Sequence, residues 1–338
     1  TKTAVLALIL LFPGAQILIW IGLYMVFYGI IYALLENDIR RILAYSIVNQ
    51  VGFMVCAVGI GTEMAINGAA AHAFAHIIYK ALLMMSAGAV LYQTGKRHCT
   101  DLGGLYRSMP ITTVCGIVGA LAISAFPFTS GFISKSMISQ AAADQQMVWV
   151  WYLLTAASAG VFLHAGIKFP WFVFFQKDSG LRPGDPPASM RWAMIGFAFL
   201  CIALGVWPEP LYRLLPYAVD YVPYTAAHVL TQLQLLLFSG LAFFVMLPWL
   251  KRTPTLTLDV DWLWRSPLPA LARGAGHAHR RLRDGLAARA GIFAARLAAG
   301  IRRHREPDGL LLRSWPTGGM ALWVMAMLLA WLVLYYLP

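Results

Sequence analysis

The feature that most constrains this chain is a series of apolar blocks about 20 residues long, separated by short polar stretches. About 20 apolar residues make a helix long enough to cross the roughly 30 Å hydrocarbon core of a bilayer. Hydrophobic residues make up 60% of the 338 residues and charged residues 12%, against about 45–50% and about 25% in soluble domains. The alternating segments typical of a membrane β-barrel are absent from the sequence. The sequence therefore predicts an all-α polytopic membrane protein.

Apolar length and Pro, Gly and charged breaks place the spans. The apolar stretch at 1–11 ends at Pro13-Gly14 and is too short for a crossing. We interpret it as the remnant of a helix and expect the chain to be the C-terminal part of a longer protein. The full spans are predicted at 15–35, 42–61, 66–93, 111–141, 148–175, 191–212, 228–250 and 317–337.

Basic residues are concentrated in alternate loops. Loops 36–41, 94–110, 176–190 and 251–316 carry nearly all of the loop lysines and arginines, and the intervening loops hold only Arg213. Cytoplasmic loops of membrane proteins carry this excess of Lys and Arg. The pattern predicts that these four segments are cytoplasmic.

The net charge of +12 is also unevenly distributed, since residues 251–315 hold 13 Lys and Arg against 5 Asp and Glu. Because this basic tract lies beside a span, it indicates contact with anionic lipids and does not indicate nucleic-acid binding. Its central part, 269–305, is too polar to span a membrane. We predict an amphipathic helix on the membrane surface, with a solvated basic helix as the alternative. Its apolar residues share an arc of roughly 100°: Leu282, Leu286, Phe293, Leu297 and Ile301.

Ionisable residues inside spans cost about 2.5–3.5 kcal/mol at the bilayer centre, so those that remain are candidates for function. His72, His76 and Lys80 are spaced i, i+4, i+8 and therefore share one helical face. Histidine and desolvated lysine can titrate near neutral pH, so this row is interpreted as a proton relay. The alternatives are structural hydrogen bonds and a zinc site, which no nearby Cys or acidic residue supports. No cofactor or metal is expected.

Lys135 is a further candidate because it follows a predicted helix break. Pro127 removes a backbone donor and Gly131 adds freedom. A broken helix exposes backbone dipoles to a water-filled cavity that can accommodate a charge. The alternative is a lysine that extends to the interface.

Lys2, in the short first stretch, is also a candidate for the proton and ion pathway. His164 and Lys168 are weaker candidates: they form a second i, i+4 pair, followed by Pro170, which predicts a kink. Near the second span, Asn37 or Asp38 is expected to cap the following helix. The spacing of Glu36 and Arg40 permits an ion pair.

Four segments follow one another in an order that resembles a known family: ENDIRRILAYSIVNQVGFM, AAHAFAHIIYKALLMMSAGAVLYQTGKR, TDLGGLYRSMP and SAFPFTSGFISKSMI. They are similar to the antiporter-like membrane subunits shared by respiratory complex I and the multisubunit monovalent-cation/proton antiporters. Within that family the chain most resembles the D-type subunit of the cation/proton antiporters, and TLDVDWLWRSP and SWPTGGMALWVMAMLLAWLVLYYL favour this. The resemblance extends over nearly the whole chain.

The resemblance implies a helical bundle of two inverted repeats, each with one broken helix. It matches Lys2 to a lysine that links two half-channels, Lys80 to the lysine of a central helix, and Lys135 to the charged residue of the second broken helix. It also implies three parts: a transmembrane core at 1–250, a lateral amphipathic segment within 251–316, and a C-terminal anchor helix at 317–338.

Three functions remain open at this level. The first is proton translocation coupled to Na⁺ or K⁺ exchange, with other membrane subunits as partners, in a bacterial inner membrane. The second is a redox-driven pump subunit of a complex I-like or membrane hydrogenase assembly. The third is a membrane scaffold without transport. No Gly-rich nucleotide loop or Cys cluster in the sequence supports redox chemistry in this chain itself.

Overall fold

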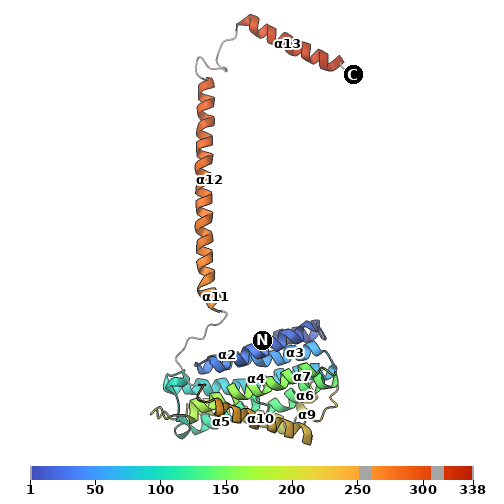
Figure 1. Ribbon diagram of the computed structural model, residues 1–338, viewed down its shortest axis with the longest axis vertical. Helices are drawn as coiled ribbons and strands as arrows, with labels where there is room; N and C mark the ends of the chain where they lie inside the picture. The colour runs from blue at the N-terminus through green and yellow to red at the C-terminus, as the bar shows by residue number, and fades with distance from the viewer. Residues whose placement is uncertain (1, 251–260, 306–315, 337–338) are drawn as a thin grey trace. The chain divides into compact units, whose positions relative to one another are not determined.

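The computed structural model describes residues 2–250, 261–305 and 316–336 (Figure 1). It divides into two compact units, Thr1–Thr257 and Leu258–Pro338. Within the described ranges the regular elements are helices, and one isolated β-bridge joins Asp38 to His98. Among the described residues, seven helices are long and apolar enough to cross a membrane, so the predicted α-helical, multi-pass class is confirmed.

The first unit is a bundle built around a long central helix. α4 (Glu63–Thr94) begins at Thr62, whose side chain accepts a hydrogen bond from the Ala65 N–H, and ends at Gly95 with φ of +66°. Such a left-handed residue ends many helices. α4 packs against α3 and against the helices that follow it, α5, α6 and α8. The elements that precede it are α1 (Lys2–Leu11), α2 (Ile17–Leu35) and α3 (Ile39–Ile60).

α2 and α3 form a closely packed antiparallel pair, which lies beside α4 in Figure 1. At Gly22 of α2 an added Cβ would overlap the backbone of Cys56 in α3. Small residues at such contacts let helix backbones approach each other in membranes. The turn between the two helices carries Asp38, whose side chain accepts from the Arg40 and Arg41 N–H groups. The predicted cap at the start of α3 is thereby confirmed.

The predicted helix break near Pro127 is confirmed. α5 (Pro110–Ile123) and α6 (Ser130–Asp144) replace the single span predicted at 111–141. Between them Ala125 and Phe128 have φ of 57° and 65°, a region that non-glycine residues rarely occupy. This turn leaves backbone carbonyls free at the end of α5.

The span that contains Pro170 does not show a simple proline kink. α7 (Val148–Val161) continues into π-helical turns at Phe162–Lys168 (η3) and Trp171–Phe175 (η4), with Pro170 between them. π-turns occur frequently at functional sites because they rotate side chains relative to the regular helix. The irregularity predicted at Pro170 thus extends over two turns.

The span predicted at 191–212 is shorter in the structure. α8 (Ala188–Val206) ends before Pro208, and α9 (Glu209–Tyr212) is a separate short helix. α10 (Ala226–Met246) completes the first unit within the described residues. Proline disfavours helical backbone in the residue before it, which accounts for the end of α8.

The second unit contains α11 (Asp261–Arg265), α12 (Pro267–Arg305) and α13 (Thr317–Tyr336). The helix predicted at 269–305 and the apolar helix predicted at 317–337 are therefore confirmed as helices. The described side chains of α12 and α13 include no buried residue. The predicted position of α12 on a membrane surface stays a prediction. The predicted boundary at 250/251 adjoins residues outside the described ranges, and so does segment 306–315.

Candidate functional site

The first unit holds a group of basic side chains in its interior. His72, His76 and Lys80 of α4 are 0%, 0% and 5% exposed, and Lys135 of α6 is 2% exposed. All four side chains therefore lie in the protein interior. Lipid cannot solvate such groups, so they must turn toward protein or water.

Lys2 joins this group from a different helix. Its Nζ forms a short hydrogen bond with Nδ1 of His76, so α1 and α4 are connected through two titratable side chains. The rings of His76 and His72 lie 6.3 Å apart between centroids. The sequence placed Lys2 among the candidates, but its contact with His76 spans 74 positions and no local spacing could reveal it.

His72 is held by three helices. Its Nε2 lies 3.1 Å from Oε1 of Gln50 in α3, and its Nδ1 lies 2.9 Å from Oγ of Ser134 in α6. Gln50 Oε1 also accepts from the Tyr79 hydroxyl at 3.1 Å. Because an amide oxygen can only accept, Nε2 of His72 donates to it. Both ring nitrogens of His72 are therefore engaged, one by a side chain of α3 and one by a side chain of α6.

Lys135 occupies the helix break. Its Nζ donates to the Ile123 carbonyl at 2.8 Å, the carbonyl that the end of α5 leaves free. The same ammonium lies 4.8 Å from the centre of the Phe53 ring, within the range of a cation–π contact. Gly131 permits the close approach at the break, since a Cβ there would overlap the Ala122 carbonyl.

A small polar cavity of about 260 Å³ adjoins Lys135. It is lined by polar residues of α6, α7 and α10, among them Ser139, Thr155 and Gln232. At one side His228 Nε2 lies 3.0 Å from Gln140 Oε1.

Four residues of this region were not predicted as candidates from the sequence: His228, Gln140, Gln50 and Tyr79. A signal was available for Gln50, because it is an uncharged polar residue inside an apolar span. A search for ionisable residues within spans does not select a glutamine, because its side chain has no titratable group.

Lys80 differs from its neighbours on α4. Within the part of the chain that the structure describes, its Nζ has no hydrogen-bond partner, and the same holds for Nε2 of His76. Lys80 is also in no ion pair with a described carboxylate. A buried ammonium without a partner is unfavourable, so water or the neutral form is needed at this position.

The second pair, His164 and Lys168, makes backbone contacts. Lys168 Nζ donates to the carbonyls of Ala33, Leu34 and Glu36 at 3.0, 2.6 and 2.6 Å, so it caps the C-terminal end of α2. A lysine near a helix C-terminus satisfies its last carbonyls. His164 Nδ1 donates to the Gly160 carbonyl at 2.8 Å. Among the described contacts, neither His164 nor Lys168 forms a hydrogen bond with Lys2, His72 or His76.

The predicted ion pair between Glu36 and Arg40 is not formed, so this prediction is wrong. Glu36 pairs instead with Arg41, with 3.2 Å between Oε2 and Nε. The cause is local: Glu36 lies before the helix start, with the dihedral angles of extended backbone, so the i, i+4 geometry of a helix does not apply. No group of three His, Cys, Asp or Glu residues suited to a metal occurs in the described ranges.

The fold and the site together define a class of protein. It is a multi-pass helical bundle with one broken helix and a buried set of basic side chains. Residues 2–161 match the family described as NADH:quinone oxidoreductase/Mrp antiporter, transmembrane. This match, together with the relatives below, confirms the resemblance to the antiporter-like membrane subunits.

Two curated relatives illustrate the family. The A/B subunit of a probable K⁺/H⁺ antiporter from Rhizobium meliloti is 30% identical over 221 residues, which cover 61% of this chain and 22% of the relative. The D subunit of an Na⁺/H⁺ antiporter from Alkalihalophilus pseudofirmus is 32% identical over 207 residues, covering 60% of this chain and 41% of the relative. The chain thus matches less than half the length of either relative.

A solved structure supports the fold. A chain of an archaeal respiratory membrane complex, the membrane-bound sulfane sulfur reductase, superposes with a TM-score of 0.58 over 94% of this chain and 56% of that chain. The sequence identity is 24%, so this likeness concerns the arrangement of helices alone.

Proposed function

We propose that this chain is a proton-translocating subunit of a multisubunit Na⁺ or K⁺/proton antiporter. The observation that carries the proposal is the hydrogen bond between Lys2 of α1 and His76 of α4, continued by His72 and its contact with Ser134 of α6. Titratable groups from separate helices meet in the interior of an apolar bundle. Placing an ionisable group there costs free energy, so such groups are usually retained for function.

The proposed order of the pathway follows these contacts. A proton on Lys2 can pass to Nδ1 of His76, which accepts its hydrogen bond. From His76 the route continues toward His72 with an intervening water, because the ring centroids are 6.3 Å apart. His72 bonds Ser134, the residue that directly precedes Lys135. Lys80, one helical turn beyond His76, is placed as a reversible proton carrier.

Lys135 connects this row to the polar cavity beside it. The cavity leads past Ser139 to the Gln140–His228 contact at 3.0 Å. We assign His228 as the group that exchanges protons with the aqueous phase at the start of α10. Imidazole suits this role because its ring nitrogens can both accept and donate a proton.

The remaining parts of the proposal concern the surroundings. Other membrane subunits are the expected partners, since the similar solved structure is part of a membrane complex and the curated relatives are antiporter subunits. Protons and Na⁺ or K⁺ are the proposed substrates. We place the chain in a bacterial inner membrane with loops 36–41, 94–110, 176–190 and 251–316 cytoplasmic, α12 against anionic lipids, and α13 as the anchor helix.

A redox-driven subunit is the second candidate, because the matching family is described by both NADH:quinone oxidoreductase and Mrp antiporter. The buried basic row would move protons in that assembly as well. A scaffold without transport is less well supported, since it gives no reason to bring five basic side chains together in the interior of the bundle: Lys2, His72, His76, Lys80 and Lys135.

The two transport functions differ in their driving force. The assembled complex, reconstituted in liposomes with a trapped pH-sensitive dye, is given an Na⁺ or K⁺ gradient and no electron donor. An antiporter moves protons in response to one of the cations. Proton movement only after a reductant and an acceptor are added would contradict exchange and favour the redox-driven subunit.

A further inference from the structure

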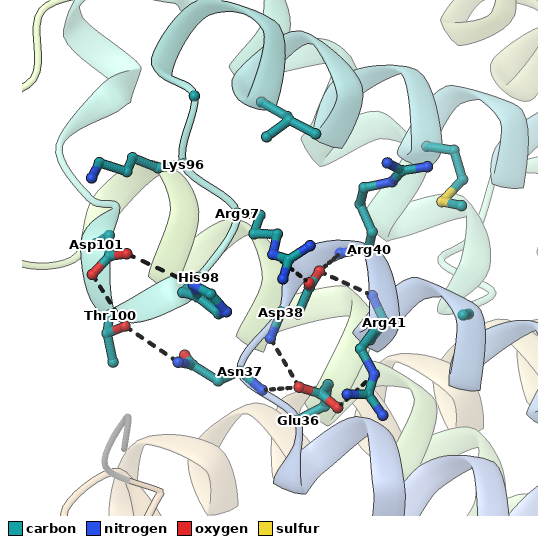
Figure 2. A pocket seen from close by; sticks show the side chains of 14 residues that line it. Glu36, Asn37, Asp38, Arg40, Arg41, Lys96, Arg97, His98, Thr100 and Asp101 are labelled. Carbon is teal, nitrogen blue, oxygen red and sulfur yellow. Dashed lines mark hydrogen bonds and ion pairs between the residues drawn. The ribbon is translucent and has the colours of Figure 1, made fainter. Parts of the chain in front are cut away.

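A second cavity, of about 1040 Å³, lies at the end of the bundle where α2 turns into α3 (Figure 2). It is formed by that turn, by the first turns of α3, by the end of α4 and by the loop that follows α4. The β-bridge between Asp38 and His98 holds the two loops together. This cavity is separate from the buried row of lysines and histidines, and the proposed function does not use it.

Two of the three carboxylates that line this cavity are paired with its arginines. Arg41 Nε lies 3.2 Å from Glu36 Oε2, and Arg97 Nε lies 3.3 Å from Asp38 Oδ2. Asp101 faces the ring of His98, with 3.8 Å between Oδ2 and Nδ1. The carboxylates of Glu36 and Asp38 are almost fully buried and also accept backbone N–H groups. These contacts leave the carboxylates little capacity to bind a further cation.

Two cations of the cavity have no such partner. Arg40 and Lys96 are exposed, and neither forms an ion pair with a carboxylate in the described ranges. In Figure 2 they lie on opposite sides of the Asp38–Arg97 pair and come from different parts of the bundle. The lining therefore holds four Lys and Arg side chains against three carboxylates, with Arg40 and Lys96 as the cations that have no carboxylate partner in the described ranges.

The wall next to Arg40 is apolar. Ala44 lies one helical turn after Arg40 on α3, and Met84 and Leu91 lie on one face of α4. Both helices are candidate membrane spans, so this wall runs from the basic end of the cavity toward the hydrocarbon region.

We propose that this cavity binds the headgroup of an anionic phospholipid, with the phosphate contacted by Arg40, further positive charge supplied by Lys96 at the opposite side of the cavity, and an acyl chain lying along Ala44, Met84 and Leu91. Basic pockets between transmembrane helices are suited to such headgroups. The combination of unpaired cations with an apolar wall selects a lipid over a free anion, which has no use for the wall. Arginine also binds phosphate oxygens in a bidentate geometry.

Photolabelling tests this site in the assembled complex. The complex is reconstituted with phosphatidylglycerol that carries a diazirine in its acyl chain, and in parallel with the matched phosphatidylcholine. After illumination, mass spectrometry locates the label. We expect phosphatidylglycerol to label the peptides that contain Met84 and Leu91, and phosphatidylcholine to label them far less.

The double variant Arg40→Gln, Lys96→Gln removes both unpaired cations without disturbing an ion pair. Each cation near a membrane surface is worth about fivefold in binding, so labelling at limiting lipid should fall roughly 25-fold. The matched control is Arg107→Gln, Lys177→Gln, which removes two exposed basic residues outside the cavity and should leave the label unchanged. If the double variant assembles poorly, each single variant should show about a fivefold loss.

Four results would overturn the proposal. Equal labelling by the two lipids would show a general lipid surface. Displacement of the label by excess inorganic phosphate would assign the cavity to a free anion. Labelling that is unchanged in the double variant, or a cavity covered by another subunit so that no lipid label enters, would assign these cations to something other than a lipid.

Discussion

At the residue scale, the buried environment of Lys80 leads to a prediction that two substitutions can test. It is 5% exposed, and its Nζ has no hydrogen-bond partner among the described residues. A proton carrier must be able to lose its proton, and arginine in a protein cannot. We therefore expect Lys80→Arg to reduce exchange nearly as much as Lys80→Ala, by at least about tenfold.

The measurement is cation-driven proton exchange in everted vesicles at equal abundance of the complex. Full activity in Lys80→Arg together with loss in Lys80→Ala would mean that Lys80 acts only as a fixed positive charge. Activity in both variants would remove Lys80 from the pathway.

Lys168 presents the opposite case at the same scale. Its ammonium donates to three carbonyls at the end of α2, the furthest 3.0 Å away, so it stabilises a helix end. Hydrogen bonds to a charged group are worth about 1.5–3 kcal/mol. We expect Lys168→Met to lower the melting temperature of the assembled complex by roughly several degrees and to leave exchange per complex largely intact.

The control for this variant is Lys177→Met, an exposed lysine in the loop that follows the same span. Melting is followed by the loss of assembled complex on heating. If Lys168→Met abolished exchange while the melting temperature stayed unchanged, Lys168 would belong to the proton pathway and capping would not be its main role.

At the scale of elements, α12 (Pro267–Arg305) carries the clearest untested prediction. Its apolar residues Leu286 and Phe293 share one face, and Arg281 lies on the other. If that apolar face rests on lipid or on neighbouring spans, cysteines at 286 and 293 should react several-fold more slowly with a membrane-impermeant maleimide than a cysteine at 281.

Background labelling in this experiment should be low, because Cys56, Cys99, Cys115 and Cys201 are all buried. Equal reactivity of the three engineered cysteines would support a solvated basic helix. A cysteine series protected along the whole of α12, on every face, would indicate a helix enclosed by other subunits.

The elements also show which features a sequence pattern can predict. The break between α5 and α6 was predictable because Pro127 and Gly131 act on the local backbone. The π-helical turns around Pro170 were not, since they depend on packing against other helices. The prediction of a Glu36–Arg40 ion pair was wrong because the i, i+4 spacing brings side chains together only within a helix. Glu36 lies outside α3, which begins at Ile39.

At the scale of the whole molecule, composition and apolar block length were sufficient to predict a multi-pass helical protein, because a bilayer imposes span length directly. The candidate site was predicted in Lys2, His72, His76, Lys80 and Lys135 and missed in His228 and in its uncharged residues. Gln50, Ser134 and Tyr79 position His72, but Gln50 and Ser134 reach it from other helices, 22 and 62 positions away in the sequence. Periodicity along one helix gives no information about such contacts.

The central claim is that buried basic side chains carry protons through this subunit, and Lys135 tests it most directly. Its ammonium sits at the helix break, between the His72–Ser134 contact and the polar cavity. The measurement is cation-driven proton exchange by Lys135→Ala in the full-length assembled complex, with Lys177→Ala as the control and complex abundance matched. We predict that the Lys135→Ala complex assembles normally and shows no exchange above background, while the control exchanges as the wild type does. Wild-type exchange in assembled Lys135→Ala would contradict it.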